Sequence, residues 1–159
     1  KAMRTHSHFL ITAFVWDALN RCRPPIHSGK AFLLGSVVPD VPLMILTLWY
    51  LIHRIKSENP PSHQNPLYGP EYDDYYFNND WWKLSLSLFH APFLIVFYLF
   101  IGAAAWTLSY KWGSPLMWFS TSCGLHACLD LVTQVEDGLL IVFPFNWHYR
   151  SHHITLNSL

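Results

Sequence analysis

Apolar residues along the chain fall into four long runs that are separated by more polar stretches. The first run, within residues 5–21, contains about 12 apolar residues, whereas a helix that crosses a bilayer needs about 20. Thr5 or Ser7 could cap such a helix, and the two prolines at 24–25 cannot continue it. We therefore predict a short N-terminal helix that lies at an interface or is half buried.

The three later runs are long enough for membrane spans. Residues 31–52 form an apolar run broken by prolines, and residues 84–110 contain no Asp, Glu, Lys or Arg and give the clearest span. The last run begins near residue 115, with apolar residues at 116–119. A short connector at 111–115 makes the last two helices antiparallel neighbours. The pattern predicts an all-α protein, a multi-span transmembrane bundle of about three spanning helices plus the short first helix. We expect one membrane-embedded domain over residues 1–159.

The one long polar segment covers residues 57–80 and is rich in proline, Asp and Tyr. We predict that it is an extramembrane loop. Trp81 and Trp82 at its end are typical of the interfacial belt, where amphipathic rings prefer to lie.

Composition agrees with a chain that is partly dissolved in lipid. Charged residues make up 13% and aromatic residues 17%, whereas about a quarter of a typical soluble domain is charged. The formal net charge is zero and the ten basic residues are scattered, so we expect no nucleic-acid partner. The three cysteines show no paired spacing, which argues against a disulfide framework and a thiolate zinc site.

Candidate chemistry gathers in the segment 124–138. In a helix, residues 126, 130, 133 and 137 share one stripe, which carries His126, Asp130, Thr133 and Asp137. Ionisable side chains within an apolar run are costly unless they have partners, so this stripe is a functional-site candidate. The alternative is a simple hydrogen bond between His126 and Asp130 within the helix.

Three further residues can reach this stripe. His90 lies a short way into its span, measured from the side of the long loop. The last helix runs antiparallel to that span and returns to the same depth near Asp130, so the two side chains can meet. Asp40 and His8 can join them. Each has a structural alternative, because Asp40 could cap a helix and His90 could be a hydrogen-bonded core residue.

Histidines and carboxylates together form a nitrogen and oxygen site. Such a site suits a divalent metal, zinc first and iron or manganese next. Bound zinc lowers the pKa of its water to about 7, and the hydroxide can attack an ester or phosphoryl centre. Asp137 or Glu136 could then accept the proton as the catalytic carboxylate.

The ordered motifs resemble those of a known family, the bacterial membrane-bound metal-dependent hydrolase-like proteins, which are distantly similar to zinc-dependent phospholipase C. The matching blocks are Thr5-His6-Ser7-His8-Phe9-Leu10, Phe32 to Asp40, Asn79-Asp80-Trp81-Trp82, Phe89-His90-Ala91-Pro92, Leu125-His126-x3-Asp130, Glu136-Asp137-Gly138 and Phe143-Pro144-Phe145-Asn146-Trp147. They cover nearly the whole chain in the family order.

The resemblance implies roles and a location for this chain. It implies metal-ligand or near-ligand roles for six residues, namely His8, Asp40, His90, His126, Asp130 and Asp137. His8 fits better than His6, because the family histidine directly precedes an apolar run. The implied location is a bacterial inner membrane or its equivalent, with membrane lipids as partners.

Departures from the family pattern keep a second function open. Leu86 stands where relatives often carry a histidine, and Gln134 and Val135 stand where they tend to carry one or two more. The chain is therefore either a membrane enzyme that hydrolyses a phosphoester or lipid-like substrate, or a non-catalytic accessory subunit. The subunit would have a degenerate or metal-free site and pack against other membrane subunits. A carrier with a proton relay of His90 and Asp130 is a third class, without the internal repeat of many transporters.

Overall fold

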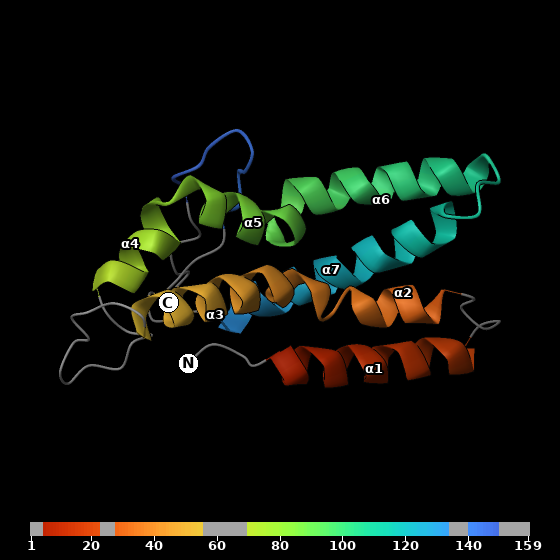
Figure 1. Cartoon of the computed structure of the whole chain (residues 1–159). Helices are drawn as coiled ribbons and strands as arrows, with labels where there is room; N and C mark the ends of the chain where they lie inside the picture. Colours follow the sequence, from red (N-terminus) through yellow and green to blue (C-terminus); the bar gives the residue numbers. More distant parts are fainter. Residues whose placement is uncertain (1–4, 23–27, 56–69, 134–139, 150–159) are drawn as a thin grey trace, which may run out of the picture. The chain divides into compact units, whose positions relative to one another are not determined.

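The computed structural model describes residues 5–22, 28–55, 70–133 and 140–149, and within these ranges every regular element is a helix (Figure 1). The elements are α1 Thr5–Cys22, α2 Gly29–Leu34, the 3-10 helix η1 Val38–Asp40, α3 Val41–Ile55, α4 Pro70–Asn78, α5 Asp80–His90, α6 Pro92–Thr107 and α7 Gly113–Thr133. The predicted all-α class is confirmed. The short N-terminal helix is present as α1, within a residue of its expected end.

The chain divides into two compact units, which we describe one at a time. The first unit comprises residues 1–39 and 87–159, and the second comprises residues 40–86. The boundary falls just before Asp40 on one side and within α5 on the other. The single membrane-embedded domain over the whole chain stays a prediction.

Helices α6 and α7 form an antiparallel hairpin in the first unit, as the short connector predicts (Figure 1). Two glycines allow the close approach. A Cβ atom on Gly102 would lie 2.6 Å from the backbone nitrogen of Met117, and one on Gly113 would lie 2.2 Å from that of Trp106. Ile95, Cys123 and Ala127 fill the core between the two helices.

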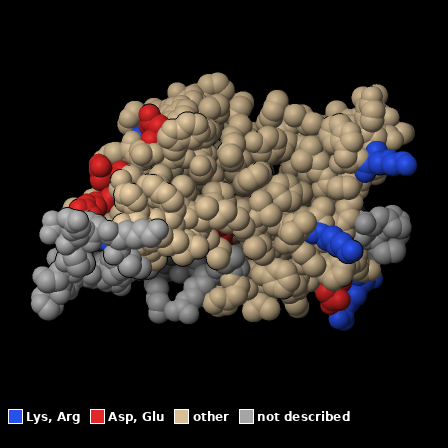
Figure 2. All heavy atoms as spheres, in the orientation of Figure 1, with Lys and Arg blue, Asp and Glu red and all other residues tan. Residues whose placement is uncertain are grey.

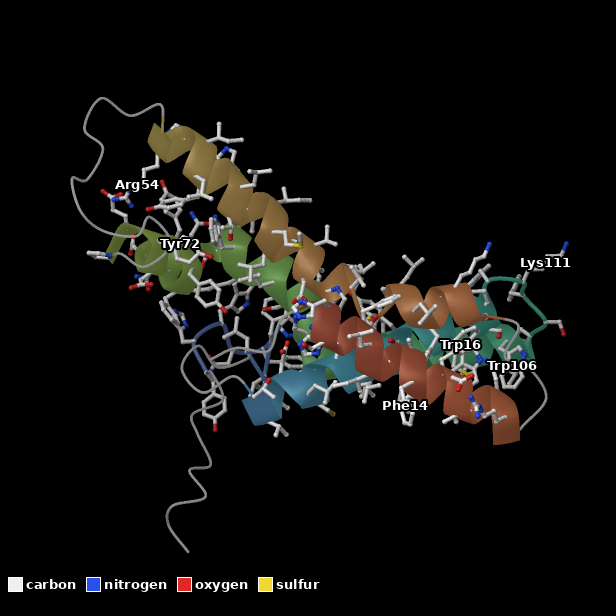
Figure 3. The ribbon with its side chains drawn as sticks, turned by 90° about the horizontal axis from the view of Figure 1, so that it is seen from below. Phe14, Trp16, Arg54, Tyr72, Trp106 and Lys111 are labelled. Atoms are coloured by element: carbon white, nitrogen blue, oxygen red, sulfur yellow. The ribbon has the colours of Figure 1, made fainter. Side chains whose placement is uncertain are left out.

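Helices α1 and α2 complete the first unit, each in contact with the other and with α7. Figure 3 shows Phe14 and Trp16 on different sides of α1. Phe14 is 74% exposed, whereas Trp16 lies so close to Gly29 that a Cβ there would meet its indole nitrogen at 2.8 Å. The inner face of α1 is therefore packed and its outer face is apolar and exposed.

The segment expected as one spanning helix over residues 84–110 consists of two helices, because the helix breaks at Ala91. Ala91 has extended backbone angles, and Pro92 begins α6. A proline disfavours helical geometry at the residue before it and donates no backbone hydrogen bond. The axes of α5 and α6 consequently differ by 48°.

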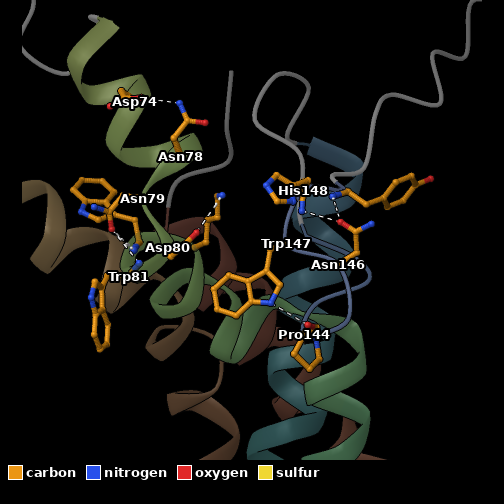
Figure 4. A network of polar contacts seen from close by, with 12 residues as sticks. Asp74, Asn78, Asn79, Asp80, Trp81, Pro144, Asn146, Trp147 and His148 are labelled. Carbon is orange, nitrogen blue, oxygen red and sulfur yellow. Dashed lines mark hydrogen bonds and ion pairs between the residues drawn. The ribbon is translucent and has the colours of Figure 1, made fainter.

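The second unit contains α3, α4 and most of α5, held together by aromatic side chains. The rings of Tyr50, Tyr72, Trp82 and Tyr75 follow one another with centroids 5.3 to 5.9 Å apart. Asn79 caps α5, since its side-chain oxygen accepts hydrogen bonds from the backbone of the two residues that follow Asp80 (Figure 4).

The long loop expected over residues 57–80 is corrected at its end. Residues 70–78 form α4, and the remainder up to residue 69 lies outside the described residues. Glu71 and Asp73 occupy the first turn of α4, where carboxylates favour the positive end of the helix dipole. The acidic residues that suggested a loop thus support the start of a helix.

One described stretch, Gly29–Arg54, is long and apolar enough to cross a membrane, and α5 with α6 adds a second if the bent pair counts as one span. The three spans of the sequence prediction stay a prediction. Figure 2 shows that uncharged residues cover almost all of the described surface in that view, with the charged side chains in a few small groups. Several large side chains of α6 are exposed, namely Phe93, Val96, Phe97, Phe100 and Ile101.

Candidate metal centre

Helix α7 supplies two side chains of the candidate site, one turn apart. His126 and Asp130 are 0% and 1% exposed, and the Nε2 atom of His126 lies 3.2 Å from Oδ2 of Asp130. Their spacing of four residues places both on the face of α7 that meets the other helices of the unit. This part of the predicted stripe is confirmed as a close pair.

Helix α1 adds His8 from the other end of the chain. Its Nε2 atom lies 3.2 Å from Oδ1 of Asp130, and its ring stacks on that of His126 with centroids 4.1 Å apart. His8 is 1% exposed, whereas His6 is exposed. The choice of His8 over His6 therefore agrees with the structure.

His90 enters from the last residue of α5, directly before the break at Ala91. Its Nε2 atom lies 3.5 Å from Oδ2 of Asp130, and its ring meets that of His126 edge to face at 5.1 Å. Side-chain donor atoms of His90, His126 and Asp130 all lie within 4.8 Å of one another. The depth argument that placed these side chains together is confirmed.

The second ring nitrogen of His126 fixes the orientation of the imidazole. Nδ1 lies 2.9 Å from the backbone oxygen of Ser36, which can only accept, so Nδ1 carries the proton and donates. In the neutral ring, Nε2 then presents a lone pair to the carboxylate of Asp130. Two acceptors at 3.2 Å repel each other unless a cation, either a metal ion or an added proton, lies between them.

The donor atoms also fit a metal ion by spacing. Zinc bound at 2.0–2.1 Å in a tetrahedral site holds neighbouring donor atoms about 3.3 Å apart. The Nε2 atoms of His126 and His90 lie 3.2 and 3.5 Å from Oδ2 of Asp130, whereas that of His8 lies 3.2 Å from Oδ1. Neither of these oxygens makes a hydrogen bond within the described part of the chain, although both are buried. A buried carboxylate in this state calls for a cation.

The four other predicted site residues lie outside the described ranges, bond within their own helix, or belong to the second unit. Asp137 and Glu136 lie outside the described residues. Thr133 donates a hydrogen bond to the backbone oxygen of Leu129 at 2.8 Å, as a helical threonine ordinarily does. Asp40 is the first residue of the second unit and stands directly before α3.

One contributor to the site could not be found from the sequence. Ser36 acts through its backbone oxygen, a group that every residue carries, and the turn after α2 presents that oxygen to His126. Ser36 itself is fully buried, and its hydroxyl donates back to the backbone oxygen of Leu33. Only a helix boundary at Leu34 would have pointed to this turn.

Comparison with family models, curated proteins and solved structures finds no match to this chain.

Proposed function

We propose that this chain is an integral membrane protein whose helices bind a divalent metal, and that it hydrolyses a phosphoester or similar bond in a lipid-like substrate. One observation carries the proposal. Three imidazole nitrogens converge on a single buried carboxylate, and Ser36 orients one of these rings with its lone pair toward that carboxylate. The ordered motifs support a relationship with the membrane-bound metal-dependent hydrolase-like family.

His8, His90, His126 and Asp130 would hold the metal in this proposal. Asp40 is a further ligand by chain connectivity, because it follows Ser36 by only four residues and Ser36 contacts His126. This set is one of nitrogen and oxygen donors, which favours zinc and then iron or manganese. Metal-bound histidines commonly donate their other nitrogen to a backbone oxygen, as His126 does to Ser36.

A bound metal would supply Lewis-acid polarisation and a water that ionises near neutral pH. The protein residues would do the rest. Burial of Asp130 and the imidazoles excludes bulk water from the donor atoms and strengthens their interactions. Glu136 or Asp137, which follow Asp130 by six and seven residues in the chain, would accept the proton.

The membrane setting of the proposal rests on the exposed apolar side chains. Leu10 and Phe14 on α1 are 64% and 74% exposed, and Phe100 on α6 is 70% exposed. The segment 84–110 contains no Asp, Glu, Lys or Arg. Such side chains are stabilised by lipid and are unfavourable in water over a contiguous surface.

Metal analysis of the purified protein, together with hydrolysis of a phosphodiester lipid in mixed micelles, tests this function. We expect about one equivalent of zinc, iron or manganese, and the loss of both metal and hydrolysis in His126→Ala and Asp130→Ala. His148→Ala is the control, because His148 is exposed. A folded wild-type protein without metal after growth in zinc, iron and manganese would refute the metal site.

A non-catalytic accessory subunit is the second candidate, favoured by Leu86. This residue lies one turn before His90 on α5, where the family resemblance implies another histidine. Fewer imidazoles would weaken metal binding. This candidate predicts a protein that stays folded without metal and co-purifies with other membrane subunits, whereas the enzyme hydrolyses its substrate as an isolated chain.

A further inference from the structure

Several helical Ser and Thr residues of this protein bond to their own helix. On α7, the hydroxyls of Ser120, Thr121 and Thr133 each donate to the backbone oxygen four residues earlier, at 2.8, 2.9 and 2.8 Å. This is the ordinary way in which such a side chain is satisfied inside a helix. It provides an internal standard for the other hydroxyls of the first unit.

Thr12 on α1 and Ser122 on α7 depart from this standard. Both are 0% exposed, and neither hydroxyl oxygen makes a hydrogen bond with any group in the described ranges. Each residue lies within its helix, so the backbone oxygen four residues earlier could accept a hydrogen bond from its hydroxyl. A buried hydroxyl in this state calls for a partner beyond its own helix. The Ser122 hydroxyl faces the end of α2, since a Cβ on Gly35 would lie 3.1 Å from its oxygen.

The two hydroxyls lie beside the candidate metal centre. Thr12 follows His8 by one turn of α1, and Ser122 precedes His126 by one turn of α7. Helices α1 and α7 run antiparallel (Figures 1 and 3), and the rings of His8 and His126 stack. One turn forward along α1 and one turn backward along α7 therefore lead away from the stacked rings in the same direction. Thr12 and Ser122 therefore each lie one turn from the stacked rings of His8 and His126, on the same side of them.

His8 has an unsatisfied nitrogen of its own. Its Nε2 atom faces Asp130, and its Nδ1 atom is buried without a hydrogen bond to any described residue. His126 differs, because the backbone oxygen of Ser36 accepts from its Nδ1 atom. A histidine that binds metal through Nε2 needs such an acceptor for its other nitrogen.

We propose that Thr12 and Ser122 bind a buried water molecule that accepts a hydrogen bond from Nδ1 of His8 and thereby holds Nε2 of His8 toward Asp130. The water donates its two hydrogens to the two hydroxyl oxygens, which gives it three partners, the usual number for a buried water. Thr12 and Ser122 are then positioning residues that act on the metal centre through His8. Their effect on metal affinity rests on the proposed function, whereas the tautomer of His8 does not.

The test uses the whole chain in detergent and five variants, one of which serves only to identify the His8 signal. Thr12→Val and Ser122→Ala each remove a hydroxyl with little change in volume, and Thr12→Ser keeps it. Ser120→Ala is the matched control, because Ser120 is equally buried on α7 but bonds to its own helix. Nitrogen-15 NMR of the metal-free protein reports which ring nitrogen of His8 carries the proton, with the His8 signal identified by its loss in His8→Gln.

We expect protonation at Nδ1 of His8 in the wild type, Thr12→Ser and Ser120→Ala, and a shift toward the Nε2 tautomer in Thr12→Val and Ser122→Ala. In a zinc titration against a competing chelator, the latter two variants should bind zinc about 10- to 100-fold more weakly. An unchanged His8 tautomer in both variants would overturn the inference. If the wild type binds no zinc, the proposed metal function fails, and the tautomer measurement still decides the water site.

Discussion

Gly35→Ala offers a sharp test of how the metal centre is held together. Gly35 closes α2 in a right-handed helical conformation that alanine also adopts, so the backbone itself adds no penalty. A Cβ atom there would lie 2.5 Å from the backbone oxygen of Phe119 and 2.7 Å from Cβ of Ser122. Ordinary contact begins at 3.4 Å, so α2 and α7 must separate by roughly 0.9 Å.

This separation reaches the site through the next residue. Ser36 accepts the hydrogen bond of His126 at 2.9 Å, and a full 0.9 Å shift along that bond would lengthen it to about 3.8 Å, which is no longer a hydrogen bond. Overpacking of this kind costs about 1–3 kcal/mol. For a chain of this size we expect the unfolding temperature to fall by about 2–12 °C. Zinc affinity should fall by about 10- to 100-fold as His126 loses its acceptor.

Gly124→Ala on α7 is the matched control. Its Cβ atom would meet Cγ2 of Ile95 at 3.6 Å, which is ordinary contact, and alanine favours the helix by about 0.8–1.0 kcal/mol. We expect this variant to unfold at or above the wild-type temperature and to bind zinc normally. Thermal unfolding in detergent and zinc titration measure both effects. If Gly35→Ala matches Gly124→Ala in both assays, the close contact between α2 and α7 does not support the site.

Two further predictions concern the helices around the centre. Asn79→Ala should lower the free energy of unfolding by about 1 kcal/mol, because the backbone N–H groups of Trp81 and Trp82 lose their cap. Asn78→Ala, at an exposed position, should lower it less. Equal effects of the two variants in denaturant titrations would rule out the cap. Phe100→Asp should deplete the protein from the carbonate-resistant membrane fraction, because inserting Asp at the centre of a span costs about 2.5–3.5 kcal/mol. Phe100→Leu is the control and should leave the membrane fraction unchanged. Normal membrane recovery of Phe100→Asp would place α6 outside the lipid.

The sequence predicts which of the described side chains lie together, because helical spacing and relative depth are readable from it. The four-residue step from His126 to Asp130 places both on one face, and the short connector before α7 brings that face back to the depth of His90. The motif order of the family resemblance adds His8. Each of these side chains lies on a helix whose period or connection was already visible.

The parts that the sequence did not predict depend on backbone detail. The break at Ala91 follows from Pro92, yet a proline can also sit in a continuous kinked span, so the hydrophobic run alone suggested one helix. In α4, acidic and aromatic residues favoured a loop, although the aromatic rings in fact pack against α3 and α5. The roles of Ser36 and of the Thr12 and Ser122 hydroxyls depend on which groups face them, and this appears only when the helices are packed.

The origin of the donor side chains also bears on how the protein is made. His8 is near the start of the chain, His90 ends a helix in its middle, and Asp130 lies near the end of the last described helix. The residues up to Asp130 must therefore be synthesised before its carboxylate can meet His8, so α1 and α5 can form before this carboxylate is available to their imidazoles. A metal ion that arrives afterwards would join the first and last helices of the unit, so that metal loading would report completed assembly.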